Sequence, residues 1–237
     1  MGLRTQRFFY HLARAIASPF VKGSVQIEVV GLAHLPSTGG AILVSNHRSD
    51  IDPSVLSVAI PRYVAWIAAA YMAKVTPMNW LIGLTGAVLV DVAGNPSASS
   101  LKQALNILHQ GGLLGIFPEG EDYIFANDFA APLAAFHRGF ALLAVKAKVP
   151  VIPVVLVPIE ETLEPIQIPE AIRADIERVQ NLDQLKQIAR YRSVRVVIGK
   201  PIDPANYSGA RKVQMQQLTQ HTRQAMQRLV ESESQKP

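Results

Sequence analysis

Short apolar runs, each bounded by turn residues, recur along this chain and alternate with helical segments. Apolar runs of four to eight residues between turn signals are typical of strands that are buried on both faces of a sheet. The strands that we expect span residues 25–29, 41–44, 63–69, 87–90, 113–117, 149–157 and 194–199. The helices that we expect span residues 3–20, 54–59, 78–84, 97–110, 136–148 and 211–230. The alternation predicts an α/β fold, a layered sheet of about seven strands flanked by helices.

Proline and charge refine this prediction at three places. Pro19 is expected to end the first helix, because proline lacks the backbone N–H and its ring clashes with the preceding turn. Pro153 lies inside the strand 149–157, which favours an edge position or a bulge for that strand. Residues 160–190 are rich in charge, and we expect a mainly helical surface excursion that carries no chemistry.

A histidine and an aspartate share the short loop that follows the strand 41–44. His47 and Asp52 lie five residues apart, after Asn46 and before a short helix. Imidazole is well suited to accept a proton near neutral pH, so the pair is a candidate catalytic site. A structural interpretation remains open for each residue. Asp52 before Pro53 is also a good helix start, and His47 also suits a hydrogen-bonded turn.

A second polar loop follows the strand 113–117. It reads Pro118-Glu119-Gly120 and continues into Glu121 and Asp122. These carboxylates fit a metal site, an acceptor-binding edge or a solvated loop, and the charge pattern alone favours the solvated loop. Ligands of open α/β sheets bind at the carboxyl ends of the strands, and both polar loops are expected at that edge.

The composition narrows the class of partner. Hydrophobic residues make up 49% of the chain and charged residues 17%, with a net charge of +5. An apolar, basic protein suits an anionic partner such as a phospholipid headgroup or a phosphorylated substrate. No basic run interleaved with aromatic residues is present, so nucleic acid is not expected as a partner. The chain has no cysteine, which excludes disulfides, thiolate catalysis and cysteine-bound zinc.

The first helix, residues 3–20, is amphipathic. Its basic residues share one face and are Arg4, Arg7, His11 and Arg14. Its apolar residues gather mainly on the other side and are Phe8, Phe9, Leu12, Ala15, Ile16 and Phe20. This pattern is typical of a helix that lies in a membrane interface, although a helix that packs its apolar face on its own domain shows it too. We therefore divide the chain into an N-terminal amphipathic helix, residues 1–22, and an α/β domain, residues 23–237.

The sequence shows no secretory signal, because the N-terminus lacks an uninterrupted apolar stretch and a cleavage site. The most apolar long segment, residues 63–90, is interrupted by Lys74, Pro77 and Asn79, so we expect no transmembrane span there. The expected location is the cytoplasm, peripheral on the inner face of a membrane.

Five short blocks resemble one family. Asn46-His47 followed by four residues and Asp52 resembles the N-H-x4-D signature of the glycerolipid acyltransferases, the 1-acylglycerol-3-phosphate acyltransferase family. Phe117 to Gly120 resembles the family's F-P-E-G motif, and Phe136 to Gly139 its F-K-x-G element. The blocks at 149–154 and 198–202 resemble its V-P-V-I-P-V and G-x-P-I elements. The resemblance runs in order from about residue 25 to residue 205 and is specific because five blocks agree.

The resemblance implies transfer of a fatty acyl group from an acyl-CoA or acyl-carrier-protein thioester to a hydroxyl of a lipid acceptor. His47 would be the general base and Asp52 would orient it, as the carboxylate does in a Ser-His-Asp triad. The substrate-binding residues that it implies are Asn46, Phe117, Pro118, Glu119, Gly120 and Arg138. It implies no metal and no cofactor other than the donor thioester, and the membrane phospholipid surface would be a partner.

Two departures from the family pattern concern the acceptor. The family usually carries arginine just after the aspartate of its second block, where this chain has Val92, and again two residues after F-P-E-G, where it has Asp122. Arginine suits bidentate phosphate binding, so the acceptor is expected to be a lysophospholipid or a related lipid rather than lysophosphatidate in particular. A non-catalytic lipid-binding protein and a thioester or lipid hydrolase remain as alternatives. Asp50 is an alternative to Asp52 as the partner of His47.

Overall fold

The computed structural model of this protein describes residues 2–91, 96–120, 133–178 and 187–234. The strands are β1 (Gln26–Val30), β2 (Ala41–Ser45), β3 (Val64–Ala69), β4 (Val88–Val90), β5 (Leu113–Ile116), β6 (Val151–Pro165) and β7 (Gln187–Ile198). The α-helices are α1 (Leu3–Ser24), α2 (Asp52–Ala59), α3 (Met78–Thr85), α4 (Ala98–His109), α6 (Gly139–Ala147), α7 (Glu170–Glu177) and α8 (Arg211–Ser234).

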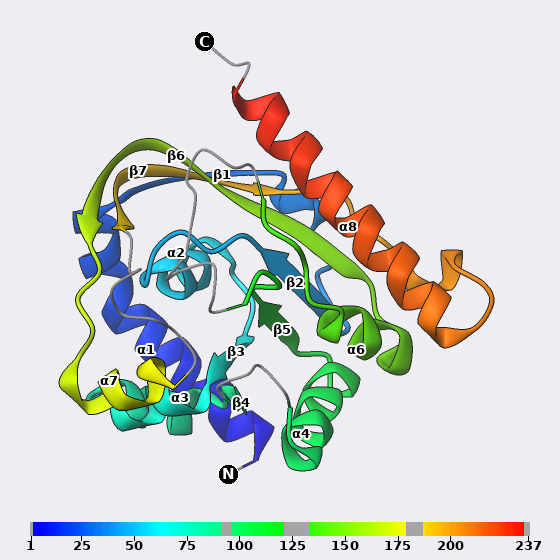
Figure 1. The fold of residues 1–237 in the computed structure, drawn as a ribbon, viewed down its shortest axis with the longest axis horizontal. Coiled ribbons are helices and arrows are strands. Elements are labelled where there is room, and N and C mark those ends of the chain that lie inside the picture. The colour runs from blue at the N-terminus through cyan, green and yellow to red at the C-terminus, as the bar shows by residue number, and fades with distance from the viewer. Residues whose placement is uncertain (1, 92–95, 121–132, 179–186, 235–237) are drawn as a thin grey trace.

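The seven strands of the described residues form one sheet in the order β1-β7-β6-β2-β5-β3-β4. The strands from β6 to β4 in this order are parallel neighbours, whereas β7 is antiparallel to β6 and β1 is parallel to β7. Figure 1 shows α1 and α2 on one side of these strands and α4, α6 and α8 on the other. The expected α/β sheet of about seven strands with helices on its faces, and the N-terminal helix, are confirmed.

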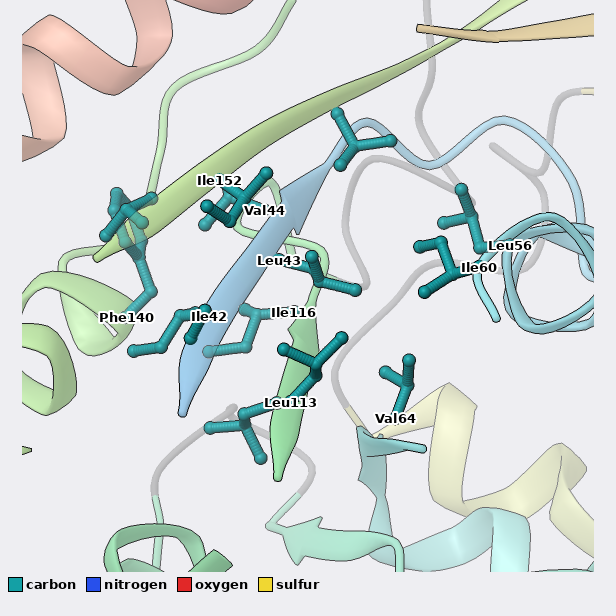
Figure 2. Close-up of a cluster of buried hydrophobic side chains, with 14 of the residues drawn as sticks. Ile42, Leu43, Val44, Leu56, Ile60, Val64, Leu113, Ile116, Phe140 and Ile152 are labelled. Atoms are coloured by element: carbon teal, nitrogen blue, oxygen red, sulfur yellow. The ribbon is translucent and has the colours of Figure 1, made fainter. Parts of the chain in front are cut away.

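The central strand β2 is buried along its whole length, as its apolar sequence predicts. Successive side chains of a strand point to opposite faces. Ile42 points toward Phe140 of α6, and Leu43 points toward Leu56 and Ile60 on the opposite face (Figure 2). Full burial of one such aliphatic side chain contributes about 1.5–3 kcal/mol. The side chains on the two faces of β2 therefore pack the helices of both layers against the sheet. This packing fixes the position of the C-terminal end of β2, where the loop with His47 begins.

The expectation of a mainly helical excursion at residues 160–190 is wrong for the described part of that stretch. β6 continues to Pro165 and pairs antiparallel with β7 from Gln187, so that the two strands form a ribbon beyond the ends of β2 and β5. We call residues 158–165 of β6 and 187–194 of β7 the β6–β7 ribbon. Its charges are cross-strand partners, because Glu164 pairs with Arg190. Only α7 is helical among the residues described between the two strands.

Both proline predictions need correction. Pro19 does not end α1, which continues to Ser24 because Val21 packs against the core and its carbonyl accepts a hydrogen bond from Val25. β6 is not an edge strand, since it lies between β2 and β7. It does carry an irregularity of the kind expected, but at Pro158 to Glu161 rather than at Pro153. The Pro153 carbonyl accepts from the N–H of Gly199, the residue just past the end of β7. The nitrogen of Pro153 lies on the same side of the strand, where the β6–β7 ladder has already ended, so the missing N–H costs the ladder no hydrogen bond.

The last helix is longer than the predicted 211–230, because α8 continues to Ser234. Glu233 is buried and its carboxylate forms an ion pair with Arg195 of β7 at 2.8 Å. This contact with the sheet holds the final turn of the helix in place.

Leu43→Ala should lower the free energy of unfolding by about 2–5 kcal/mol, because it opens a cavity between β2 and α2. Leu12→Ala is the matched control, since Leu12 is 45% exposed on α1, and we expect it to change stability by no more than about 0.5 kcal/mol. Urea denaturation followed by circular dichroism measures both. Equal losses in the two variants would contradict the described core.

Candidate active site

The loop after β2 is fixed to the neighbouring strand by Asn46. Its side-chain nitrogen donates to the Leu156 carbonyl at 3.0 Å, and its side-chain oxygen accepts from the Leu156 N–H at 2.8 Å. The amide therefore acts as one more rung between β2 and β6 at the point where β2 ends. Both atoms of this amide are engaged by backbone, so the geometry supports a structural role for Asn46 in starting the loop.

His47 and Asp52 face each other across this loop. Nδ1 of His47 lies 2.8 Å from Oδ2 of Asp52. The Asp52 side chain is fully buried, whereas that of His47 is 14% exposed, so the ring keeps an edge open to solvent. With Nδ1 directed at the carboxylate, Nε2 is the ring nitrogen that remains for proton transfer. The arrangement has the form of the base and carboxylate in a catalytic triad.

The Asp52 carboxylate is not the helix cap that its place before Pro53 suggests. Its Oδ2 accepts from the backbone N–H groups of Arg48 at 2.6 Å and Ser49 at 2.8 Å, which precede α2. The residue at the N-cap position of α2 is Ile51, which has no side-chain cap. Asp52 therefore holds the loop that carries His47 rather than the first turn of the helix.

Asp50 is not the partner of His47 in this structure. Its carboxylate forms an ion pair with Arg190 of the β6–β7 ribbon, and its side chain is 56% exposed. Of the two aspartates, Asp52 is the one that contacts the imidazole.

Three aromatic rings form a stack that ends on His47. The Phe117 ring lies over the imidazole with centroids 4.0 Å apart and an interplanar angle of 19°. The Trp66 ring stacks on the other face of Phe117 at 5.3 Å and 10°. Gly115 makes room for the indole, since a Cβ there would lie 2.3 Å from the Trp66 ring. The stack gives the imidazole one apolar face, and Trp66 is a member that the sequence did not single out.

Glu119 is a buried acid beside the His47 loop. It is 4% exposed, and its Oε1 accepts from the Ala134 N–H at 3.3 Å. Burial raises the pKa of Glu119 to about 7, and the backbone N–H groups of His47 and Ala134 oppose this rise. Among the described residues no donor reaches its Oε2. Glu119 is therefore not a residue of a solvated loop, which the charge pattern alone favoured.

The neighbours of Glu119 hold the turn. The Pro118 carbonyl accepts from the His137 N–H at 2.8 Å. Gly120 has a φ of 76°, a conformation that suits glycine, and a Cβ there would lie 3.1 Å from the His137 ring. The F-P-E-G turn and the segment before α6 thus pack on each other.

Arg138 lies farther along that segment. It is exposed and faces α8 across an open hollow of about 420 Å³. The residues that line this hollow are Ala135, Phe136, Arg138, Gln216, Thr219, Gln220 and Arg223. His137, the residue before Arg138, is the one that packs against Gly120.

The β6–β7 ribbon supplies site residues that the sequence did not indicate. The Tyr191 hydroxyl donates to Oδ1 of Asp52 at 2.9 Å. Arg48, next to His47, forms an ion pair with Glu161 of β6. The Ala189 N–H donates to the Arg48 carbonyl at 3.1 Å. Glu161 and Ala189 lie within the stretch 160–190, from which we expected no chemistry, and both contact the His47 loop through Arg48. Tyr191, which contacts Asp52, lies one residue beyond that stretch.

The residues at the two missing arginines, Val92 and Asp122, lie outside the described residues, as does Glu121. Within the described ranges, no three histidine, aspartate or glutamate side chains gather as a group that would hold a metal ion.

A family model described as Acyltransferase matches residues 26–157 of this chain. Among curated proteins, a probable 1-acyl-sn-glycerol-3-phosphate acyltransferase of Mycoplasma pneumoniae is 26% identical over 196 residues, which cover 80% of this chain and 66% of that protein. The 1-acyl-sn-glycerol-3-phosphate acyltransferase alpha of Mus musculus is 30% identical over 142 residues, 56% of this chain and 45% of that protein. The chain thus spans less than two thirds of the length of either relative.

Among solved structures, a 1-acyl-sn-glycerophosphate acyltransferase from Thermotoga maritima matches with a TM-score of 0.64 and 20% identity. The match covers 96% of this chain and 83% of that one. At this identity the similarity concerns the fold. His47, Asp52 and Glu119 lie inside the matched family region, whereas Tyr191 lies beyond it.

The raised pKa of Glu119 predicts a pH-dependent stability. An acid with a pKa of about 7 when folded and 4.5 when unfolded binds more protons in the folded state between these values. The free energy of unfolding should therefore fall as the pH rises through this window, by an amount on the order of 3 kcal/mol. In Glu119→Gln this slope should be absent.

Urea denaturation of both proteins at about pH 5 and about pH 8 measures the difference. Glu177→Gln serves as the control, since Glu177 is exposed on α7, and it should keep the native slope. A Glu119→Gln variant with the native slope would contradict the buried, protonated carboxyl.

Proposed function

The chain belongs to the Acyltransferase family, and we propose that it transfers a fatty acyl group from a thioester donor, acyl-CoA or acyl-carrier protein, to a hydroxyl of a lysophospholipid or related lipid acceptor. The observation that carries the proposal is the 2.8 Å contact between Nδ1 of His47 and Oδ2 of Asp52. The carboxylate is fully buried and the imidazole is partly open, as a base that must meet a substrate requires.

The proposed transfer proceeds in two proton-coupled stages. Nε2 of His47 takes the proton of the acceptor hydroxyl while the hydroxyl oxygen attacks the thioester carbonyl. Asp52 stabilises the imidazolium that forms. The tetrahedral intermediate then collapses, the carbon–sulfur bond breaks, and the imidazolium returns the proton to the leaving thiolate. The products are an oxygen ester and the free thiol of the donor.

Direct transfer fits the residues better than a covalent acyl-enzyme. The chain has no cysteine, so a thiolate nucleophile is absent, and it has no G-x-S-x-G turn. The stacked Phe117 shields one face of the imidazole with apolar surface. Such surface suits the acyl chain of a lipid substrate and keeps water from competing with the acceptor.

Two observations bear on the identity of the lipid acceptor, the names of the relatives and the positions at which this sequence lacks the family's usual arginines. Two relatives carry names that specify 1-acyl-sn-glycerol-3-phosphate. This chain has Val92 and Asp122 where the family usually carries arginine, which favours a lipid other than lysophosphatidate. We place the acceptor beside Phe117, Glu119 and Gly120, and we keep Arg138 as a proposed contact with a substrate phosphate.

The exposed face of α1 supports a membrane surface as a partner. Four large apolar residues recur every fourth position on α1 and are exposed: Phe8 by 64%, Leu12 by 45%, Ile16 by 61% and Phe20 by 74%. The α3 helix, which packs against α1, adds Trp80, which is 71% exposed. We propose that this apolar surface inserts into the interface of a phospholipid membrane.

Two basic residues of α1, Arg7 and Arg14, hold the helix on the protein. The Arg14 guanidinium donates to the carbonyls of Ser57 and Val58 near the end of α2. Arg7 donates to the Gln110 carbonyl after α4. The helix packs on its own domain through these contacts and the buried Tyr10, while the apolar residues from Phe8 to Phe20 named above stay exposed. Of the helices that the structure describes, none is both long and apolar enough to cross a bilayer. We propose a peripheral position on the inner, cytoplasmic face of a membrane.

Asp52→Asn should lower kcat of acyl transfer by about ten-thousand-fold, because an amide cannot stabilise the imidazolium and favours the wrong tautomer. His47→Gln should reduce transfer to background. Asp50→Asn should keep activity within about twofold, since Asp50 contacts Arg190 and not the imidazole. The assay offers a radiolabelled acyl-CoA with a panel of lysophospholipids and resolves the lipid products.

The same assay separates the alternatives. Free fatty acid released at the same rate with and without acceptor would indicate a hydrolase. Lipid binding without thiol release from any thioester would indicate a non-catalytic lipid-binding protein. Near-native turnover in His47→Gln, with an unchanged circular dichroism spectrum, would rule out the proposed base.

Replacing Phe8 and Phe20 together by Asp should abolish most co-sedimentation with anionic phospholipid vesicles, since both rings lie on the exposed apolar face of α1. Burial of each ring in lipid is worth about 1.5–3 kcal/mol, so the affinity should fall by more than about a hundredfold. Val213→Asp is the control, because Val213 is 45% exposed on α8 and outside this face. Native binding by the double variant would exclude α1 as the membrane contact.

A further inference from the structure

We propose that Tyr191 is a positioning residue of the active site, whose hydroxyl holds the Asp52 carboxylate in place and limits the attraction of that carboxylate for the imidazolium of His47. This inference rests on the proposed function, because it assigns to Tyr191 a role in the same proton transfer. Tyr191 would not touch the substrate, and it would act through Asp52.

The hydrogen bonds to Asp52 are unequally divided between its two oxygens. Oδ2 receives three donors, which are Nδ1 of His47 and the N–H groups of Arg48 and Ser49. Oδ1 receives the Tyr191 hydroxyl at 2.9 Å. Asp52 is fully buried, so each oxygen needs a donor from the protein. Tyr191 fixes the second oxygen and with it the plane of the carboxylate.

Tyr191 can only donate in this bond. Burial, and next the charge of Asp52, raise the pKa of the Tyr191 hydroxyl well above its ordinary range. The hydroxyl therefore keeps its proton at every pH at which the protein would work. A neutral donor on Oδ1 draws negative charge away from Oδ2, which faces the imidazole.

The β6–β7 ribbon brings Tyr191 to this place. Tyr191 of β7 lies opposite Glu161 of β6, and Glu161 forms an ion pair with Arg48 of the loop. The charged groups that face the Tyr191 hydroxyl are thus Asp52, Arg48 and Glu161. The Ala189 N–H, two residues before Tyr191, donates to the Arg48 carbonyl. These contacts join the ribbon to the loop on both sides of Tyr191 and place its hydroxyl against the carboxylate.

Loss of the hydroxyl has two separable effects. The carboxylate loses a constraint on its plane, which weakens the alignment of His47 and lowers the rate at every pH. The carboxylate of Asp52 also loses one hydrogen-bond donor, so it attracts the imidazolium of His47 more strongly. The variant therefore needs a higher pH than the native protein before His47 can act as a neutral base. A residue with a merely structural role would lower stability without moving the pH profile.

The test compares Tyr191→Phe with Tyr63→Phe in the full chain. Tyr63→Phe is the matched control. Tyr63 is also a buried tyrosine whose hydroxyl donates one hydrogen bond, to the Thr85 carbonyl, and it lies just before β3, away from the loop. The kcat/KM for acyl-CoA and a lysophospholipid is measured against pH. Tyr191→Phe should be about tenfold less active on the plateau, with its acidic limb at higher pH. Tyr63→Phe should keep the native plateau and limb.

A ring-fluorinated tyrosine in place of Tyr191 provides a second measurement that keeps the hydroxyl and the packing. Fluorination makes the hydroxyl a stronger donor, so the acidic limb should move to lower pH, opposite to the shift in Tyr191→Phe. Glu119, with a pKa of about 7, also titrates in this pH range, but neither replacement changes Glu119 itself. Shifts of the acidic limb in opposite directions in the two variants would therefore come from Tyr191 and not from Glu119.

Proton NMR of the substrate-free protein tests the same bond without any reaction. The Nδ1 proton of His47, bonded to Asp52, should give a far-downfield resonance that disappears in His47→Gln. This resonance should shift in Tyr191→Phe and stay in place in Tyr63→Phe. An unchanged resonance and an unchanged acidic limb in Tyr191→Phe would overturn the inference. A shifted resonance in a protein that transfers no acyl group would overturn the proposed function and leave the positioning of the pair by Tyr191 supported.

Discussion

The Asp52 carboxylate is buried away from water, and the local structure supplies the hydrogen-bond donors that such a carboxylate needs. An isolated ionised carboxylate in a protein interior is strongly unfavourable unless donors surround it. Three of its donors come from the loop that Asp52 itself closes, and the fourth comes from Tyr191, on a strand near the other end of the chain. Burial of this carboxylate therefore requires three things together. The loop must keep its conformation, His47 must carry its proton on Nδ1, and β7 must bring Tyr191 to Asp52.

The sheet topology makes this arrangement possible. Because β2 and β5 are parallel neighbours, the loops after them leave the sheet at the same edge, which brings Phe117 and Glu119 to His47. The antiparallel β7 runs the other way, so its beginning rather than its end reaches that edge. The site thus combines the ends of parallel strands with the start of an antiparallel one. Gly115 of β5 completes it, because the absence of a side chain there leaves room for Trp66 in the aromatic stack.

Local patterns were enough to predict the strands, the loop pair and the shared edge, because each depends on neighbours in sequence. Apolar runs specify buried strands, and His47 and Asp52 are five residues apart on one loop. The β6–β7 ribbon was missed because its alternating charges, which are cross-strand partners, also suit a solvated helix. Tyr191 was missed for a related reason, since nothing near it in sequence indicates a partner in another element. Pro19 in α1 shows the same limit, because tertiary packing of Val21 overrides the local preference of proline.

Tyr191 follows Asp52 by 139 residues, and this separation has a consequence for the chain as it is made. Synthesis proceeds from the N-terminus, so His47 and Asp52 emerge from the ribosome long before the strand that completes their surroundings. Until β7 has emerged and paired with β6, Oδ1 of Asp52 has only solvent to bond. A nascent chain can therefore hold the His47 and Asp52 motif before it can hold the full set of donors around Asp52, which is complete only when β7 has paired with β6.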